Sequence, residues 1–138
     1  MNIDDFAVGF KASESIKISD AMVRKFAEMS GDFNPVHLDD NFAATTRFKK
    51  RIAHGMILGA LTSRVLNEKL GGGGIYLGQT LKFIKPVYID DTVTIELEMI
   101  KLHKTRGLGQ VETTAKNQKG DVVMKGEATI VMQWGIKS

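Results

Sequence analysis

The sequence contains no cysteine, and this absence excludes several classes of protein at once. A disulfide-stapled domain, a thiolate enzyme and a Cys-ligated metal site are all ruled out. No run of apolar residues approaches the roughly 18 or more that a membrane span needs, and residues 1–10 lack the apolar core of a signal peptide. We therefore expect a soluble, cytoplasmic protein with no membrane partner.

Aromatic residues are scarce, with one Trp and two Tyr, and the net charge is only +3. Basic residues are spread along the chain apart from one cluster, Arg47-Phe48-Lys49-Lys50-Arg51. A nucleic-acid-binding face usually shows denser positive charge with interleaved aromatic residues, so nucleic acid is not expected as a partner. We interpret the cluster as a solvated loop, with contact to the phosphates of a carrier as the alternative.

The chain also lacks the motifs of common metal and cofactor sites. Gly71–Gly74 is not followed by the Lys-Ser/Thr of a phosphate-binding loop. The three histidines show no metal-ligand spacing. Asp32 and Asp39-Asp40 lack the accompanying Gly and Glu of an EF-hand. We expect no metal and no cofactor.

What is present indicates one α+β domain spanning residues 1–138. Residues 10–18 are expected to form an edge strand. Ser19 can cap a helix that begins at Asp20, and Gly31 can end it in a left-handed conformation. Residues 41–46 are expected to form a short helical turn. The apolar face of the first helix is assigned to Met22, Val23, Phe26, Ala27 and Met29.

The apolar pattern of residues 55–70 predicts a second helix. Its first turns are apolar on all sides, so we expect this helix to be buried. After Gly71–Gly74 the apolar period changes to two, which is typical of strands with one solvated face. Strands are expected at residues 75–83, 92–99, 108–115 and 124–134, with a turn at Asn117–Gly120. The pattern predicts a long antiparallel sheet wrapped around one buried helix, with edges and apolar surface that dimerisation would cover.

One short segment places several reactive groups together. It reads Gly31-Asp32-Phe33-Asn34-Pro35-Val36-His37. Asp32 or the Asn34-Pro35 pair alone would be interpreted as turn formers, and His37 alone as a loop histidine. Together they supply a carboxylate and an imidazole whose ordinary pKa suits proton transfer near neutral pH. The set therefore favours activation of a water molecule.

A His-Gly pair, His54-Gly55, stands where the second helix begins. The glycine can simply permit the turn, or its N–H can act as an oxyanion donor at a helix N-terminus. His54 is interpreted as structural. Ser63 lies eight residues after Gly55 on the same helix, without the Gly-x-Ser-x-Gly of a nucleophile elbow. A ligand contact and a core position for Ser63 both stay open.

Several segments resemble the MaoC-like hydratases, which include the R-specific enoyl-CoA hydratases. They are Gly31–Asp39, Arg51–Met56, Ile75–Gln79 and Phe83–Val87. The resemblance implies a single hot-dog fold, a homodimer and an active site near the dimer interface. It further implies that Asp32 and His37 are the catalytic pair and that the Gly55 N–H is the oxyanion donor. By the same resemblance, Ser63 is an active-site serine and Asn34 orders the loop or the water.

The implied reaction is reversible hydration of trans-2-enoyl-CoA to (R)-3-hydroxyacyl-CoA, in which CoA is part of the substrate and no further cofactor is needed. The closest alternative is an (R)-3-hydroxyacyl dehydratase whose substrates are carried by acyl carrier protein. A hot-dog acyl-CoA thioesterase and a non-catalytic acyl-thioester-binding module are more distant alternatives. The numerous methionines are compatible with a pliable acyl tunnel or with ordinary core packing.

Overall fold

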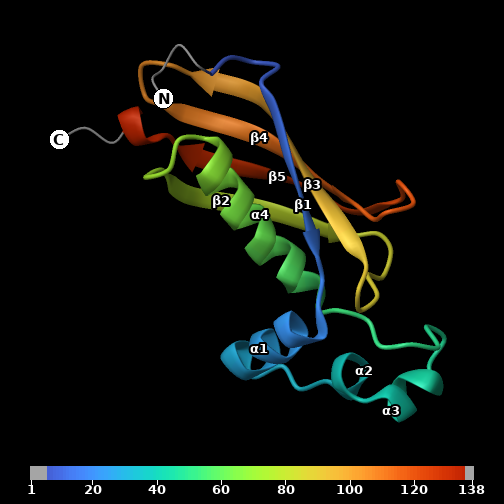
Figure 1. The fold of residues 1–138 in the computed structure, drawn as a ribbon. Coiled ribbons are helices and arrows are strands. Elements are labelled where there is room, and N and C mark those ends of the chain that lie inside the picture. Colours follow the sequence, from blue (N-terminus) through green and yellow to red (C-terminus); the bar gives the residue numbers. More distant parts are fainter. Residues whose placement is uncertain (1–5, 136–138) are drawn as a thin grey trace.

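The protein folds as one antiparallel sheet that curves around a central helix. A computed structural model describes residues 6–135. The expectation about a signal peptide concerns residues 1–10, of which residues 1–5 lie outside this range. The strands are β1 (Lys11–Lys17), β2 (Ile75–Phe83), β3 (Thr92–His103), β4 (Leu108–Lys116) and β5 (Val122–Val131). They form a five-stranded sheet in the order β1-β3-β4-β5-β2, in which every neighbouring pair is antiparallel (Figure 1).

The sheet follows the alternation predicted from the sequence. In β3, the side chains of Val93, Ile95, Leu97 and Met99 are buried, while their neighbours along the strand are only partly covered. The β4–β5 turn forms at the predicted residues, because the Asn117 side chain accepts the Lys119 N–H at 2.9 Å and Gly120 adopts a φ of 82°. The last strand ends at Val131 instead of Trp134, which lies in a 3-10 helix.

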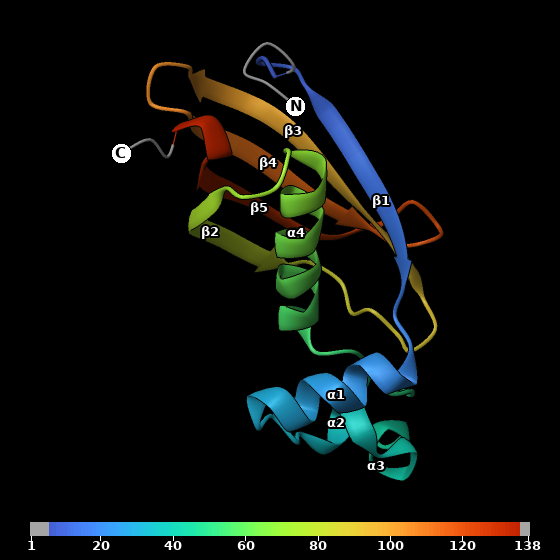
Figure 2. The ribbon, with the colours of Figure 1, turned by 60° about the vertical axis from the view of Figure 1, so that its left-hand side comes forward.

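The helix α4 (Gly55–Lys69) lies across the concave face of the sheet (Figures 1 and 2). Its buried side consists of Ile57, Leu58, Leu61, Thr62, Val65 and Leu66. The sequence predicted that the first turns of α4 are buried on every side. In a single chain this is wrong, since Met56 is 54% exposed and Ala60 is also exposed. The sheet of a single chain covers only one side of the helix.

The two edges of the sheet differ in character. β1 is an edge strand, as predicted, and pairs only with β3 within the sheet of the described residues. β2 forms the other edge and pairs with β5, although β3 follows it in the chain. Four large apolar or aromatic side chains of β2 are exposed, Ile75, Tyr76, Leu77 and Phe83. Uncovered apolar side chains on an edge strand mark a surface that association would protect.

Three short helices lie together near the first turn of α4: α1 (Asp20–Ser30), α2 (Pro35–Leu38) and α3 (Asp40–Ala44) (Figure 2). Ser19 caps α1 by accepting the Met22 N–H at 3.1 Å, and Gly31 ends it with a φ of 79°, both as predicted. Met29 is 74% exposed, so its assignment to the apolar face of α1 is wrong. It lies in the last turn, beyond the part of the helix that packs on the core.

No membrane-crossing helix is found between residues 6 and 135, because none there is both long and apolar enough.

Candidate active site

Asp32 lies in the loop that follows α1, one residue after the C-terminal glycine of the helix. Its backbone N–H donates to the Ser30 hydroxyl at 3.1 Å, and its carboxylate accepts the Asn34 N–H at 3.2 Å. These bonds close a tight turn of the kind that Asp and Asn favour. The side chain is exposed, so the second carboxylate oxygen can reach water or a ligand.

His37 is carried by α2, a single turn that the sequence alone did not predict as a helix. The Asn34 side chain accepts the Val36 N–H at 3.1 Å, and Pro35 occupies the first helical position. The helix therefore begins at the Asn-Pro pair. The implied role of Asn34 in ordering the loop or the water stays a prediction, and this cap supports the loop.

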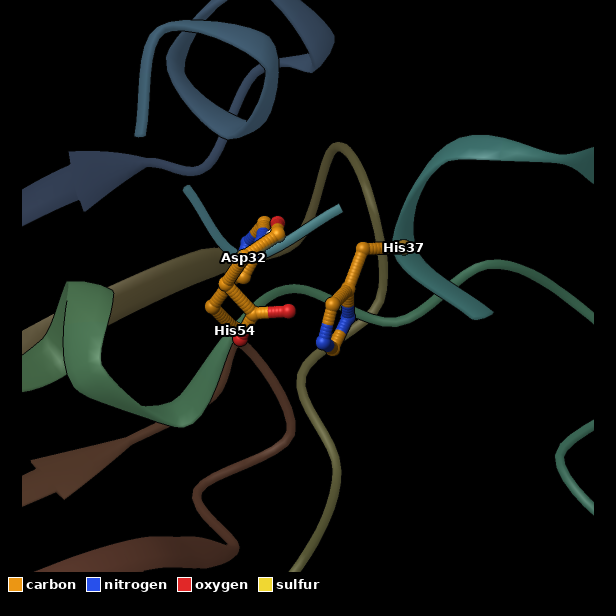
Figure 3. Close-up of side chains that lie close together, drawn as sticks. All are labelled: Asp32, His37 and His54. Atoms are coloured by element: carbon orange, nitrogen blue, oxygen red, sulfur yellow. Dashed lines mark hydrogen bonds between the residues drawn. The ribbon is translucent and has the colours of Figure 1, made fainter. Parts of the chain in front are cut away.

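The imidazole of His37 is buried and has a defined orientation. Its Nδ1 lies 2.7 Å from the carbonyl oxygen of Ile52, an acceptor only, so Nδ1 carries a proton. The neutral ring consequently presents an unprotonated Nε2, the form that accepts a proton from water. Figure 3 shows the Asp32 carboxylate directed toward this ring.

His54 joins these two residues, although the sequence interpretation assigned it only a structural role. One ligand-type atom from each of Asp32, His37 and His54 lies within 4.8 Å of the others. Nε2 of His54 is 2.9 Å from the carbonyl oxygen of Asp32, and its ring centroid is 3.9 Å from that of His37. His54 therefore ties the Asp32 loop to the start of α4 and packs against His37.

The cluster is poorly arranged for a metal ion despite its composition. The rings of His37 and His54 stack with an interplanar angle of 31°. Nitrogen lone pairs lie in the ring plane, so stacked rings direct them side by side, whereas a tetrahedral zinc site needs them to converge. Nδ1 of His37 is already bonded to Ile52. The absence of a metal stays a prediction, which this geometry supports.

Burial shapes the ionisation of His37. Removal from solvent is the largest influence and lowers the pKa below the usual 6.5, and the neighbouring His54 lowers it further. The hydrogen bond to the Ile52 carbonyl and the charge of Asp32 act in the opposite direction without cancelling the effect. His37 is therefore neutral at pH 7 and available as a base.

A cavity of about 270 Å³ opens beside the cluster and is lined by His37, His54, Gly55 and Phe83 among others. Gly55 is the first residue of α4, so its N–H has no acceptor within the helix. A Cβ atom at this position would lie 3.0 Å from the Phe83 ring. The glycine thus leaves room for a ligand to approach an unpaired N–H at the positive end of the helix dipole.

Ser63 is not part of this cluster. It lies two turns further along α4 and lines a second cavity of about 220 Å³, together with Asn67 and Tyr76. The Tyr76 hydroxyl donates to the Gln79 side chain, and burial raises the pKa of Tyr76 to about 12, so this phenol stays neutral. The structure therefore gives Ser63 a place in a mostly apolar cavity rather than beside Asp32 and His37.

Comparisons with known proteins identify the family and the fold. Residues 6–121 match the MaoC like domain. The chain is 43% identical to an (R)-specific enoyl-CoA hydratase of Aeromonas caviae, over 94% of this chain and 98% of that protein. It is 32% identical to a mitochondrial 3-hydroxyacyl-[acyl-carrier-protein] dehydratase of Arabidopsis thaliana, over 91% of this chain and 76% of that one.

Solved structures give the same result for the fold. An unliganded R-hydratase of Pseudomonas aeruginosa superposes with a TM-score of 0.90 at 44% identity, covering 94% of this chain and 84% of that one. The expected single hot-dog fold, an antiparallel sheet wrapped around a long helix, is therefore confirmed. By the match over residues 6–121 and by these identities, the chain belongs to the MaoC-like domain family.

Proposed function

We propose that this protein is an R-specific enoyl-CoA hydratase, which adds water reversibly to trans-2-enoyl-CoA to give (R)-3-hydroxyacyl-CoA. One observation carries the proposal: a carboxylate and a neutral imidazole with a free Nε2 lie together beside a cavity that Gly55, the first residue of α4, also lines. The 43% identity to an (R)-specific enoyl-CoA hydratase supports the same reaction.

The reaction follows from the positions of these groups. Conjugation with the thioester carbonyl makes C3 of the substrate electrophilic. A water molecule held by Asp32 and His37 adds its oxygen to C3 while the free Nε2 of His37 accepts one of its protons, and the Asp32–His37 pair then delivers that proton to C2. The C2–C3 π bond is replaced by one C–O bond and one C–H bond, so atoms and charge balance. Dehydration is the same sequence reversed.

Negative charge develops on the thioester oxygen as water adds. The Gly55 N–H and the N-terminal dipole of α4 are placed to stabilise it. Because the enolate needs no electron sink beyond the thioester, the chemistry requires neither a metal nor a redox cofactor, and CoA enters only as part of the substrate. The face of C3 that receives the oxygen sets the configuration, and we assign Asp32 and His37 to the face that gives the R product.

We assign the cavity beside Ser63 to the acyl chain. Its walls include Leu66, Ile130 and Met132, which suit a hydrocarbon, and Ser63 and Asn67 supply polar atoms. Met132 is the one methionine in this lining, and at this position the acyl-tunnel interpretation of the methionines fits. The assignment separates the reacting end of the substrate, at the cavity beside His37, from its tail.

We further propose that CoA is the carrier. Exposed Arg47 and Lys85 line the cavity beside His37. Lys85 is paired with Asp121 at 3.6 Å, so Arg47 is the cation that we assign to the phosphates of the carrier. An acyl carrier protein bearing the same pantetheine arm remains the alternative.

The choice between the two carriers is tested by the rate at which the enoyl absorbance is lost with crotonyl-CoA and with the crotonyl thioester of the carrier protein. A higher kcat/KM for the CoA ester supports the proposal, and a reversed preference would favour the dehydratase alternative.

A homodimer in the cytoplasm is the assembly that we propose. Met56 on the exposed side of α4 and the β2 residues Ile75 and Leu77 are uncovered apolar side chains that a second copy would cover. Pairing would bury the first turns of α4, as the sequence analysis expected for that helix. The molecular mass in solution from light scattering distinguishes a dimer from a monomer.

The activity should depend on pH through His37. Because the pKa of His37 lies below 6.5, the acid limb of kcat/KM for hydration should have its midpoint below pH 6.5, and the rate should approach its plateau as the pH rises above neutrality. The sign follows from the base being the neutral ring, which is lost on protonation. A pH profile of kcat/KM checks this. An acid limb with its midpoint above 6.5 would contradict the assignment of His37 as a neutral buried base.

Glycine at position 55 should be needed for close approach of the substrate. Gly55→Ala should lower kcat/KM about tenfold or more, because a Cβ atom crowds Phe83 and the position that the thioester oxygen occupies. Gly59→Ala is a matched control one turn along α4, where a Cβ would lie 3.0 Å from Leu81, away from the cavity beside His37. Equal losses in both variants would assign the effect to helix packing instead.

A further inference from the structure

Arg51 stands out among the described charged residues because its side chain is almost fully buried. The residue is only 8% exposed, although it ends a run of basic residues interpreted above as a solvated loop. A guanidinium is rarely buried unless it is paired and hydrogen-bonded. Arg51 was not singled out by the sequence analysis, and no step of the proposed reaction uses it.

The guanidinium connects two segments that are distant in the sequence. Its Nε donates to the backbone carbonyl oxygen of His37 at 2.8 Å. Its Nη2 donates to the carboxylate of Asp20, the first residue of α1. Asp20 is held in turn by Arg24, whose Nε lies 3.0 Å from the other carboxylate oxygen. These bonds keep the pKa of Asp20 below its usual value, so the carboxylate is charged at pH 7.

His37 is thereby held from two directions by two consecutive residues. Arg51 binds its backbone oxygen, and Ile52 accepts from its ring Nδ1 at 2.7 Å. The Ile52 N–H also donates to the carbonyl oxygen of Val36 at 3.2 Å. The helix that carries His37 has only four residues, and so short a helix is not stable by itself. Its position depends on these outside contacts.

We propose that Arg51 is a positioning residue, which ties the backbone of His37 to the start of α1 and so holds the imidazole at the distance from Asp32 that catalysis needs. Arg51 acts through the main chain of His37 and not on the substrate. The inference rests on the proposed function for its kinetic consequence, but not for its structural one. A displacement of about 1 Å in a reacting group can cost roughly a hundredfold in rate.

The first test compares Arg51→Met with Arg64→Met. Methionine keeps much of the apolar stem of Arg51 and removes both hydrogen bonds, whereas Arg64 forms ion pairs with Glu14 and Glu68 at the other end of α4. We expect Arg51→Met to lower kcat for crotonyl-CoA hydration at least tenfold while KM changes less than about threefold. Arg64→Met should leave kcat unchanged. A folded Arg51→Met with wild-type kcat would overturn the proposal, and so would equal losses in the two variants.

The second test is chemical rescue. A groove lined by Asp20, Arg51 and Tyr88 opens to solvent on this side, so guanidinium can reach the space that Arg51→Ala leaves. Added guanidinium should restore a measurable part of kcat in Arg51→Ala. It should not raise kcat in Arg64→Ala, which is expected to keep the wild-type rate. Arg51→Lys should not restore wild-type kcat, because the single ammonium group of lysine cannot bond the His37 carbonyl and the Asp20 carboxylate in the geometry of the planar guanidinium. Full activity of Arg51→Lys would contradict the positioning role.

A third readout does not depend on hydratase activity. The imidazole nitrogens of His37, followed by NMR, should report the Nδ1-protonated tautomer in the wild type and a mixture of tautomers in Arg51→Met. If the wild type hydrates no enoyl thioester, the proposed function fails while this measurement still tests the contact. If Arg51→Met does not fold, Asp20→Asn weakens the same tie and should shift the His37 resonances in the same direction. Unchanged His37 resonances in the folded variant would reject the inference.

Discussion

Replacing His37 by asparagine is expected to lower kcat for crotonyl-CoA hydration by about 10²–10⁴, the range typical of a lost general base or acid. Asparagine is the most specific replacement for removing Nε2 alone, because its amide nitrogen lies near the position of Nδ1. The variant can keep the bond to the Ile52 carbonyl while it loses Nε2. The fold should therefore survive, and KM should change little because the ring is not expected to bind the carrier.

The control for this variant is His103→Gln, at the exposed end of β3, where the ring lies away from the cluster. It should keep wild-type kcat. Steady-state kinetics, with circular dichroism to confirm folding, provides the measurement. Near wild-type turnover in His37→Asn would remove His37 from the catalytic pair and leave His54 as the imidazole to examine.

Asp32→Asn should produce a loss of similar size, about 10²–10⁴ in kcat. The asparagine oxygen can still accept the Asn34 N–H, so the turn that follows α1 is preserved and the effect reports the lost negative charge. Asp40→Asn changes an exposed carboxylate in α3 and should leave the rate unchanged.

The two replacements should also be non-additive. If Asp32 and His37 act on one water, the double variant should be hardly slower than either single variant, since removing one partner already disables the pair. Losses that multiply would show that the two groups act in separate steps, and wild-type turnover in Asp32→Asn would remove the carboxylate from the mechanism.

The parts of this fold that depend on neighbours in sequence were predictable. Ser19 and Gly31 mark the two ends of α1 because capping depends on a few adjacent backbone groups. The β4–β5 turn and the alternation along β3 are equally local. The proposed roles of Asp32, His37 and Gly55 also came from a compact motif, together with its resemblance to a known family.

The features that sequence reasoning missed depend on long-range contacts. His54 meets the Asp32 carbonyl across 22 positions of the chain, so nothing adjacent to it indicated a place in the cluster. Arg51 belongs to a basic run that reads as a loop, and only the fold brings Asp20 and the His37 carbonyl to its guanidinium. A residue such as Met56 reads as buried because the sequence does not say how many sides of α4 one sheet can cover.

Hydration of crotonyl-CoA in D₂O, followed by chiral and isotopic analysis of the product, tests the central claim most directly. The account predicts rapid loss of the enoyl absorbance and formation of (R)-3-hydroxybutyryl-CoA with one deuteron at C2, on the face that received the oxygen. An S product, or release of free CoA thiol without hydration, would contradict it.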